Sequence, residues 1–255
     1  MGPPSIGCPC VNRPMALGLL GCRVCEPWVR ALSFHLVIPR ARRIPDLVCN
    51  FEGAAWRNVA PLMIEHFHPR SSSHRPVARA KLIHTSDALC AIFQVRDRFV
   101  RSICLNYQDS VCRDSCVELF VQPRKGRGYF NFEVNCGGTM LLYYIEDPSL
   151  VAKLPHNCTP VAVEHALQVR IATTMPRTTP VEIQEPVEWQ VQMTIPFHVL
   201  EEYAGRIGDI CGKQWRGNLY KCADDSSHPH WASWAPVGEE LNFHQPDRFG
   251  VWEFE

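Results

Sequence analysis

The chain of 255 residues is long enough to bury a sizeable hydrophobic core, in one large domain with a tail or in two small domains. Its 26 lysines and arginines balance its 26 aspartates and glutamates, so no overall charge attracts nucleic acid or a membrane surface. No run approaches the roughly 20 apolar residues that a membrane-spanning helix needs. We therefore expect a globular protein with no nucleic acid partner and no membrane span.

The first 43 residues differ in composition from the rest of the chain. They contain six arginines but only one acidic residue, Glu26. The apolar segment 15–22 is too short for the core of a signal peptide and lacks a clean basic start. We expect residues 1–43 to be a disordered, targeting-like or wrongly assigned extension, and residues 44–255 to form one domain.

Thirteen cysteines are scattered along the chain. Cys22 and Cys25 form a CxxC pair, but no second pair follows at the distance of a zinc ribbon, so we expect no structural zinc. Cysteines inside apolar runs usually behave as small buried hydrophobic residues. The disulfide state stays open.

From about residue 44, short runs rich in β-branched and aromatic residues predict strands, and turn residues separate several of them. The expected strands are 81–85, 88–96, 116–122, 129–136, 140–146, 166–172, 188–195, 217–222, 231–235 and 250–254. One short helix is expected at 197–203, after Pro196. This pattern predicts an all-β protein, an antiparallel β-sandwich of jelly-roll type with one short helix.

Two of these strands, 116–122 and 129–136, flank a loop at 123–128 and each carries a glutamate in its middle. If the loop closes a regular hairpin, Glu118 lies opposite Glu133, and Cys116 lies opposite Asn135. The alternation then places Val117, Leu119, Val121, Phe130, Phe132 and Val134 on an apolar face. Asn131, Glu133 and Asn135 share the other face with Glu118.

Like charges directly opposite each other on a sheet repel. A neighbouring cation, a shared proton or a ligand that donates hydroxyl groups to both carboxylates would make the pair tolerable. A solvated face with water between the carboxylates is the plain alternative. The neighbouring asparagines favour a ligand such as a sugar, because amides and carboxylates together offer donors and acceptors.

The two hairpin stretches, DSCVELFV (114–121) and YFNFEVNC (129–136), resemble carbohydrate-binding module family 9, in its stand-alone "family 9-like" branch. The resemblance continues through ARAKLIHTSDALCAIFQVRD (78–97), WQVQMTIPFHVL (189–200), WRGNLYKCADDSSHPHWASWAPV (215–237) and FHQPDRFGVWEF (243–254). It covers roughly residues 44–255 in order. It implies a β-sandwich that binds poly- or oligosaccharides without cleaving them, in carbohydrate catabolism, in an extracytoplasmic setting and alongside glycan-degrading enzymes.

The resemblance also assigns residues to a sugar site. The family's carboxylate corresponds to Glu118 and its amide to Asn135, whereas its first stacking aromatic falls on Cys112 and an arginine of some members is Glu133 here. The second aromatic falls on or near Phe243. The expected ligand-binding residues are Glu118, Asn131, Glu133, Asn135, Asn218, Tyr220, Trp234 and Phe243. Each of Trp231 and Trp234 is equally consistent with core packing.

Other functions remain open at this point. Glu118 and Glu133 could serve as the two carboxylates of a glycoside hydrolase, because opposed strand residues approach the spacing of a retaining enzyme. A haem-binding redox module could use Met63, His66 and His68, although no CxxCH motif is present. No cofactor is expected. Calcium is left open without a supporting motif, and the histidines of His228-Pro229-His230 are more often structural than metal ligands.

Overall fold

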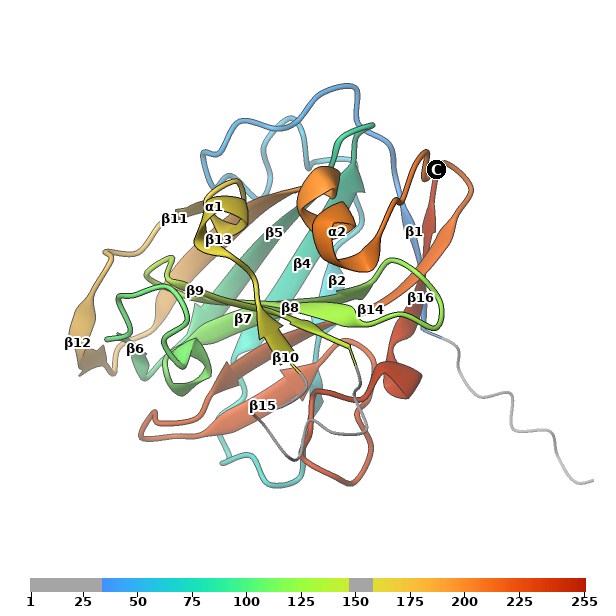
Figure 1. Cartoon of the computed structure of the whole chain (residues 1–255). Coiled ribbons are helices and arrows are strands. Elements are labelled where there is room, and N and C mark those ends of the chain that lie inside the picture. The colour runs from blue at the N-terminus through green and yellow to red at the C-terminus, as the bar shows by residue number, and fades with distance from the viewer. Residues whose placement is uncertain (1–33, 147–157) are drawn as a thin grey trace, which may run out of the picture. The chain divides into compact units, whose positions relative to one another are not determined.

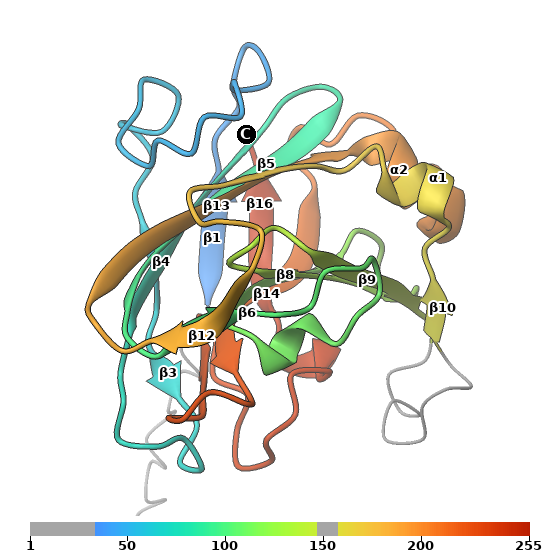
Figure 2. The same ribbon diagram turned by 90° about the vertical axis from the view of Figure 1, so that its left-hand side faces the viewer.

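The computed structural model describes residues 34–146 and 158–255, which form a β-sandwich (Figure 1). Two large sheets pack face to face, and the strands of one cross over the strands of the other (Figures 1 and 2). The expected all-β sandwich is therefore confirmed. None of the described helices is long and apolar enough to cross a membrane.

The first sheet has the strand order β1–β16–β14–β7–β8–β9–β10, with β15 paired to β14 and β3. Its strands are β1 (His35–Ile38), β3 (His66–Phe67), β7 (Cys116–Gln122), β8 (Tyr129–Asn135), β9 (Met140–Ile145), β10 (Cys158–Pro160), β14 (Gln214–Ala223), β15 (His230–Ser233) and β16 (Gly250–Phe254). Described neighbours in this sheet are antiparallel, except that β1 runs parallel to β16.

The second sheet has the order β11–β13–β5–β4–β2 and is antiparallel. Its strands are β2 (Leu62–Ile64), β4 (Val77–His84), β5 (Ala88–Asp97), β11 (Arg170–Thr173) and β13 (Val187–Pro196). A separate ribbon pairs β6 (Val100–Ser102) with β12 (Thr179–Ile183).

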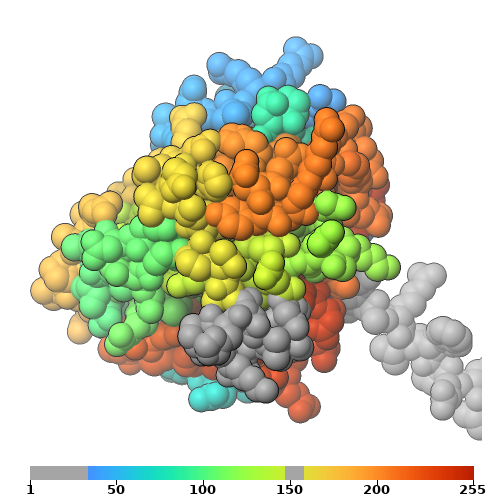
Figure 3. Space-filling model, in the orientation of Figure 1, coloured from blue at the N-terminus to red at the C-terminus, as the bar shows by residue number. Residues whose placement is uncertain are grey.

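Two α-helices, α1 (Val163–Ala166) and α2 (Phe197–Ala204), and two 3₁₀ helices, Val111–Arg113 and Pro246–Arg248, lie among the described residues. Helix α2 begins directly after Pro196, whose missing N–H costs nothing at a helix start, and ends at Gly205 with a φ of 76°. The backbone N–H of Ala162 donates to the hydroxyl of Tyr203 at 2.8 Å. This bond keeps α1 beside α2 on one face of the molecule (Figure 3).

The interior between the sheets is filled by the apolar faces of their strands. The hairpin residues expected in the core are all buried there, namely Val117, Leu119, Val121, Phe130, Phe132 and Val134. Burying a side chain such as Phe132 contributes about 1.5–3 kcal/mol to the free energy of unfolding. The period-2 alternation of the sequence therefore assigned this face correctly.

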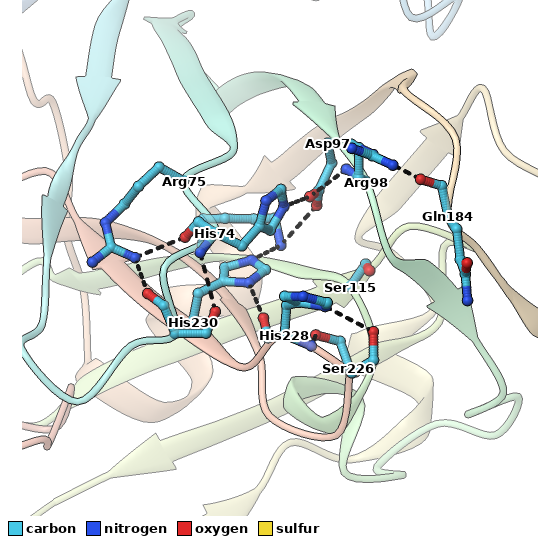
Figure 4. Close-up of polar contacts among 12 residues, drawn as sticks. His74, Arg75, Asp97, Arg98, Ser115, Gln184, Ser226, His228 and His230 are labelled. Atoms are coloured by element: carbon cyan, nitrogen blue, oxygen red, sulfur yellow. Dashed lines mark hydrogen bonds and ion pairs between the residues drawn. The ribbon is translucent and has the colours of Figure 1, made fainter.

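A polar network also crosses the interior. The ammonium group of Lys221 on β14 lies 3.2 Å from a carboxylate oxygen of Asp97 on β5, and it donates to His230 at 2.8 Å. The other oxygen of Asp97 accepts hydrogen bonds from His74 and from the backbone of Arg98. Figure 4 shows Asp97, His74 and His230 gathered at this junction. The network links the two sheets by charge as well as by packing.

The structure corrects several boundaries predicted from the sequence. Part of the supposed extension belongs to the sandwich, because β1 pairs with β16 and buries Ile38 in the core. A domain start at residue 44 is therefore too late, whereas residues 1–33 lie outside the described part of the chain. The strand expected at 166–172 is the end of α1 followed by β11. The sequence also missed the short strands β1, β2, β3, β6, β10 and β12, which are stabilised by pairing with distant strands.

Candidate functional site

The β7–β8 hairpin has the register expected from its loop length. Glu118 pairs with Glu133, and Cys116 pairs with Asn135. Strand β14 continues the sheet beyond β7 and places Tyr220 opposite Glu118 and Cys222 opposite Cys116. The polar face of the hairpin is thus one part of a face shared by β14, β7, β8 and β9.

This face is buried. Glu118 is 2% exposed and Glu133 is 6% exposed. The segment that precedes the 3₁₀ helix Pro246–Arg248 covers part of the face: the ring of Phe243 stacks on Tyr220 with centroids 4.1 Å apart, and His244 bonds to the hydroxyl of Tyr129 at 2.8 Å. The alternative of a solvated carboxylate pair on an open sheet is therefore wrong.

Two adjoining cavities lie over this face. The larger, of about 500 Å³, is lined by residues that include Asn131, Glu133 and Tyr143. The smaller, of about 310 Å³, is lined by residues that include Glu118 and Trp231. The residues that line both are Cys112, Glu133 and His244. The hairpin carboxylates therefore reach into a hollow large enough for a small ligand.

Burial and mutual repulsion govern the two carboxylates. Burial, followed by the charge of Glu133, raises the pKa of Glu118 well above its usual range, although the thiol of Cys222 donates to its Oε1 at 3.0 Å. Burial raises the pKa of Glu133 to about 7 against the lowering effect of a 2.8 Å hydrogen bond from Asn131. No lysine or arginine among the described residues lines either cavity. The pair is therefore uncompensated by a basic side chain on its own face.

A second acidic group and an aromatic ring border the smaller cavity. The indole N–H of Trp231 donates to a carboxylate oxygen of Asp224 at 2.7 Å. Burial raises the pKa of Asp224 above its usual range. Trp231 is only partly buried and lines this cavity. The ring supplies an apolar platform beside the carboxylates.

The sequence profile of carbohydrate-binding family 9 matches residues 51–254. The chain belongs to carbohydrate-binding family 9. No curated protein matches the chain. Family 9 is a family of non-catalytic binding modules, and membership gives carbohydrate binding as the function of the chain.

Solved structures share the fold of this family 9 chain. A candidate carbohydrate-binding protein of Bacteroides uniformis ATCC 8492 is 24% identical, with a TM-score of 0.77 over 88% of this chain and 100% of that one. A family 9 module of Caldicellulosiruptor kristjanssonii, solved with cellotriose, is 15% identical, with a TM-score of 0.58 over 87% of this chain and 93% of that one. A family 9 module of the same organism, solved with glucose, gives the same identity and TM-score over 87% of this chain and 95% of that one.

Four of the eight residues expected to bind the sugar line the cavities. Asn131 and Glu133 line the larger cavity, and Glu118, Glu133 and Phe243 line the smaller. They come from β7, from β8 and from the segment before the second 3₁₀ helix. The structure thus brings together residues that lie up to 125 positions apart in the sequence (Glu118 to Phe243).

The other four have structural contacts instead. Asn135 is fully buried, and its amide donates to Cys104 O and Asp114 Oδ2. Asn218 is fully buried and bonds twice to the backbone of Ala235. Their hydrogen-bonding groups hold loops in place, so they do not present a polar group to either cavity.

Tyr220 and Trp234 are also placed differently from the prediction. Tyr220 is fully buried beneath Phe243 and donates to its carbonyl at 3.0 Å, so it supports the cavity wall. Trp234 belongs to the core, where its ring packs against Phe34 and occupies the space that a side chain at Gly250 would need. Trp231, three residues earlier, is the tryptophan that lines a cavity. The alternation of side chains along the strand indicated that Trp231 and Trp234 face opposite ways. It did not indicate which of the two faces the ligand.

Sequence reasoning missed Tyr143, Asp224 and His244 as cavity residues. Tyr143 lies in an apolar run, and its backbone pairs with that of Asn131 across β8 and β9. His244 is partly buried, and desolvation of its ring lowers its pKa to about 4. No local pattern marks these residues, because the fold alone brings them to the hairpin.

The residues considered for haem do not form a ligand set. Met63 lies on β2 of the second sheet, whereas His66 lies on β3 of the first. The ring of His68 bonds to the backbone carbonyl of Glu239 at 3.0 Å. The His228-Pro229-His230 pair is likewise used structurally: His228 stacks on Phe99, and His230 bonds to Lys221.

Proposed function

We propose that the two adjoining cavities bind a neutral carbohydrate and that the chain does not cleave it. The observation that carries this proposal is the group of carboxylate and amide side chains, Glu118, Glu133 and Asn131, at the floor of a hollow of a suitable size. Carboxylate oxygens accept hydrogen bonds from sugar hydroxyls. The ring of Trp231 can contact the C–H face of a pyranose.

The charges around the cavities favour a neutral sugar over an acidic one. Glu118, Glu133 and Asp224 line the cavities, and no described lysine or arginine does. A uronic acid would bring a further carboxylate into this group, and like charges in a partly desolvated cavity repel strongly. A neutral oligosaccharide such as cellotriose, which the Caldicellulosiruptor module binds, has no such penalty.

The arrangement of the carboxylates favours binding without cleavage. Glycosidases place two carboxyl groups on either side of the scissile bond. Glu118 and Glu133 instead lie on adjacent strands of one sheet and approach a ligand from the same side. A role in recognising poly- or oligosaccharides, alongside enzymes that degrade glycans, fits such a non-catalytic module.

Calorimetric titration of the full chain with cellotriose tests the proposal. At a pH where Glu118 is ionised, Glu118→Gln should weaken binding by about 1.5–3 kcal/mol, the range for hydrogen bonds to charged groups. The same change at the exposed Glu202 of α2 serves as the matched control and should leave affinity unchanged. Glucuronic acid should bind more weakly than glucose. Failure of both cellotriose and a wider panel of neutral glycans to bind would overturn the proposal, as would release of glucose from cellotriose.

A further inference from the structure

Two cysteines and a glutamate meet on the buried face of β7 and β14, beside the smaller cavity. Cys116 on β7 and Cys222 on β14 are directly paired across the two strands, and Glu118 follows Cys116 on the same face of β7. Both sulfur atoms and a carboxylate oxygen of Glu118 lie within 4.8 Å of one another. All three residues are at most 2% exposed.

This spacing suits a metal ion held by thiolates. Zinc–sulfur bonds of about 2.3 Å and zinc–oxygen bonds of about 2.1 Å place the ligand atoms of a tetrahedral site about 3.6–3.8 Å apart. The Cys222 sulfur and the Glu118 oxygen are 3.0 Å apart as hydrogen-bonded partners, so only a small side-chain rotation is needed to admit an ion. Two sulfur ligands favour zinc over calcium or magnesium, which prefer oxygen.

The local charges favour a cation at the same point. Glu118 faces Glu133 across the hairpin, and no described lysine or arginine lines the cavities. Lys221 is next to Cys222 in the chain, but its ammonium group pairs with Asp97 and bonds to His230. A divalent cation would supply the positive charge that this carboxylate pair lacks.

We infer that Cys116, Cys222 and Glu118 form a binding site for one zinc ion. Binding would replace the two thiol protons, which leave to solvent, and would break the hydrogen bond from Cys222 to Glu118. Glu118 and Cys222 also line the smaller cavity, which gives the ion a route from solvent and leaves space for a water molecule as the fourth ligand. This inference goes beyond carbohydrate binding and does not depend on it.

Cobalt(II) is a suitable probe, because it occupies thiolate zinc sites and gives absorption bands that zinc does not. The full chain, reduced and stripped with a chelator, would be titrated with cobalt(II) in the absence of sugar. The CxxC pair Cys22 and Cys25 lies outside the described residues, so a Cys22→Ser/Cys25→Ser background would be titrated in parallel. We expect one cobalt per chain in this background, with a thiolate-to-cobalt charge-transfer band that zinc abolishes.

Variants assign the band to the three residues. Cys116→Ser and Cys222→Ser should each weaken or remove it, and Glu118→Gln should lower cobalt affinity by about tenfold or more. Cys90→Ser, a change to a buried cysteine on β5 of the other sheet, is the matched control and should leave the band intact. Far-ultraviolet circular dichroism would check that each variant folds.

The inference is overturned if the doubly substituted background gives no charge-transfer band, or if Cys90→Ser removes the band as completely as Cys116→Ser does. A disulfide between Cys116 and Cys222 that forms in place of metal binding would also overturn it. Cellotriose binding measured on the chelator-treated protein reports on the sugar site separately, so either proposal can fail while the other stands.

Discussion

Lys221 and Asp97 form an ion pair of 3.2 Å between the two sheets, and both side chains are completely shielded from solvent. The ammonium group also donates to His230 and to the backbone carbonyl of Cys222. A buried ion pair is stable while both partners are present, but either charge alone would be costly to bury. The pair therefore fixes how β14 and β5 lie against each other.

Replacing Lys221 by methionine removes one charge from this pair and leaves Asp97 buried beside two histidines. We expect the free energy of unfolding to fall by about 3–5 kcal/mol, the usual cost of breaking a buried pair. Urea unfolding measures the change. Arg113→Ala, which breaks an exposed pair with Asp225, is the comparison and should change stability little. Equal effects of the two substitutions would show that the interior pair has no special role.

The same network predicts a pH dependence. Burial, together with the charge of Lys221, lowers the pKa of His230 from about 6.5 to about 3. Between about pH 6.5 and pH 3 the unfolded chain therefore binds a proton at His230 and the folded chain does not. The free energy of unfolding consequently falls as the pH falls below 6.5. Asp97 and His74 face the same ring.

To isolate this contribution, urea unfolding of wild type and His230→Asn would be compared at pH 7.5, 5.5 and 4.5. The difference in free energy of unfolding between wild type and His230→Asn should be largest at pH 7.5 and should shrink at pH 5.5 and again at pH 4.5. A constant difference across this range would contradict the assignment of the proton to His230.

Strand β1 should contribute to stability, although the sequence predicted that residues 1–43 are a disordered, targeting-like or wrongly assigned extension. Ile38 is fully buried in the core, whereas its neighbour Val37 is 45% exposed. Ile38→Ala should lower the free energy of unfolding by about 2–5 kcal/mol. Val37→Ala, on the other face of the same strand, should have a much smaller effect. Thermal or urea unfolding of both variants decides whether β1 packs as described.

Trp231 should be the aromatic platform for the sugar. Trp231→Ala should weaken cellotriose binding several-fold, because the apolar ring beside Glu118 is lost. Trp231→Phe keeps a ring face but loses the hydrogen bond to Asp224, so its effect should be intermediate. Calorimetric titration provides the affinities. Unchanged affinity in Trp231→Ala would show that Trp231 does not stack on the sugar, and Tyr143 would be the next residue to test.

The sequence alone determined the strand alternation, the hairpin register and the fold class. Side chains alternate strictly along a strand, so the pattern of 116–122 and 129–135 assigns the core face, and the loop length assigns Glu118 to Glu133. These are local properties of neighbouring residues. The resemblance to family 9 rested on the same stretches.

Only the tertiary structure decided how deeply the carboxylates are buried and what surrounds them. The segment around Phe243 and His244 closes over the polar face from more than 100 positions away along the chain, and no local pattern encodes that contact. The choice between Trp231 and Trp234 likewise depends on the space beside Gly250. The burial of the two carboxylates depends on strands that meet only in the folded sheet. The raised pKa of Glu133 and the approach of Cys222 to Glu118 follow from that burial and pairing.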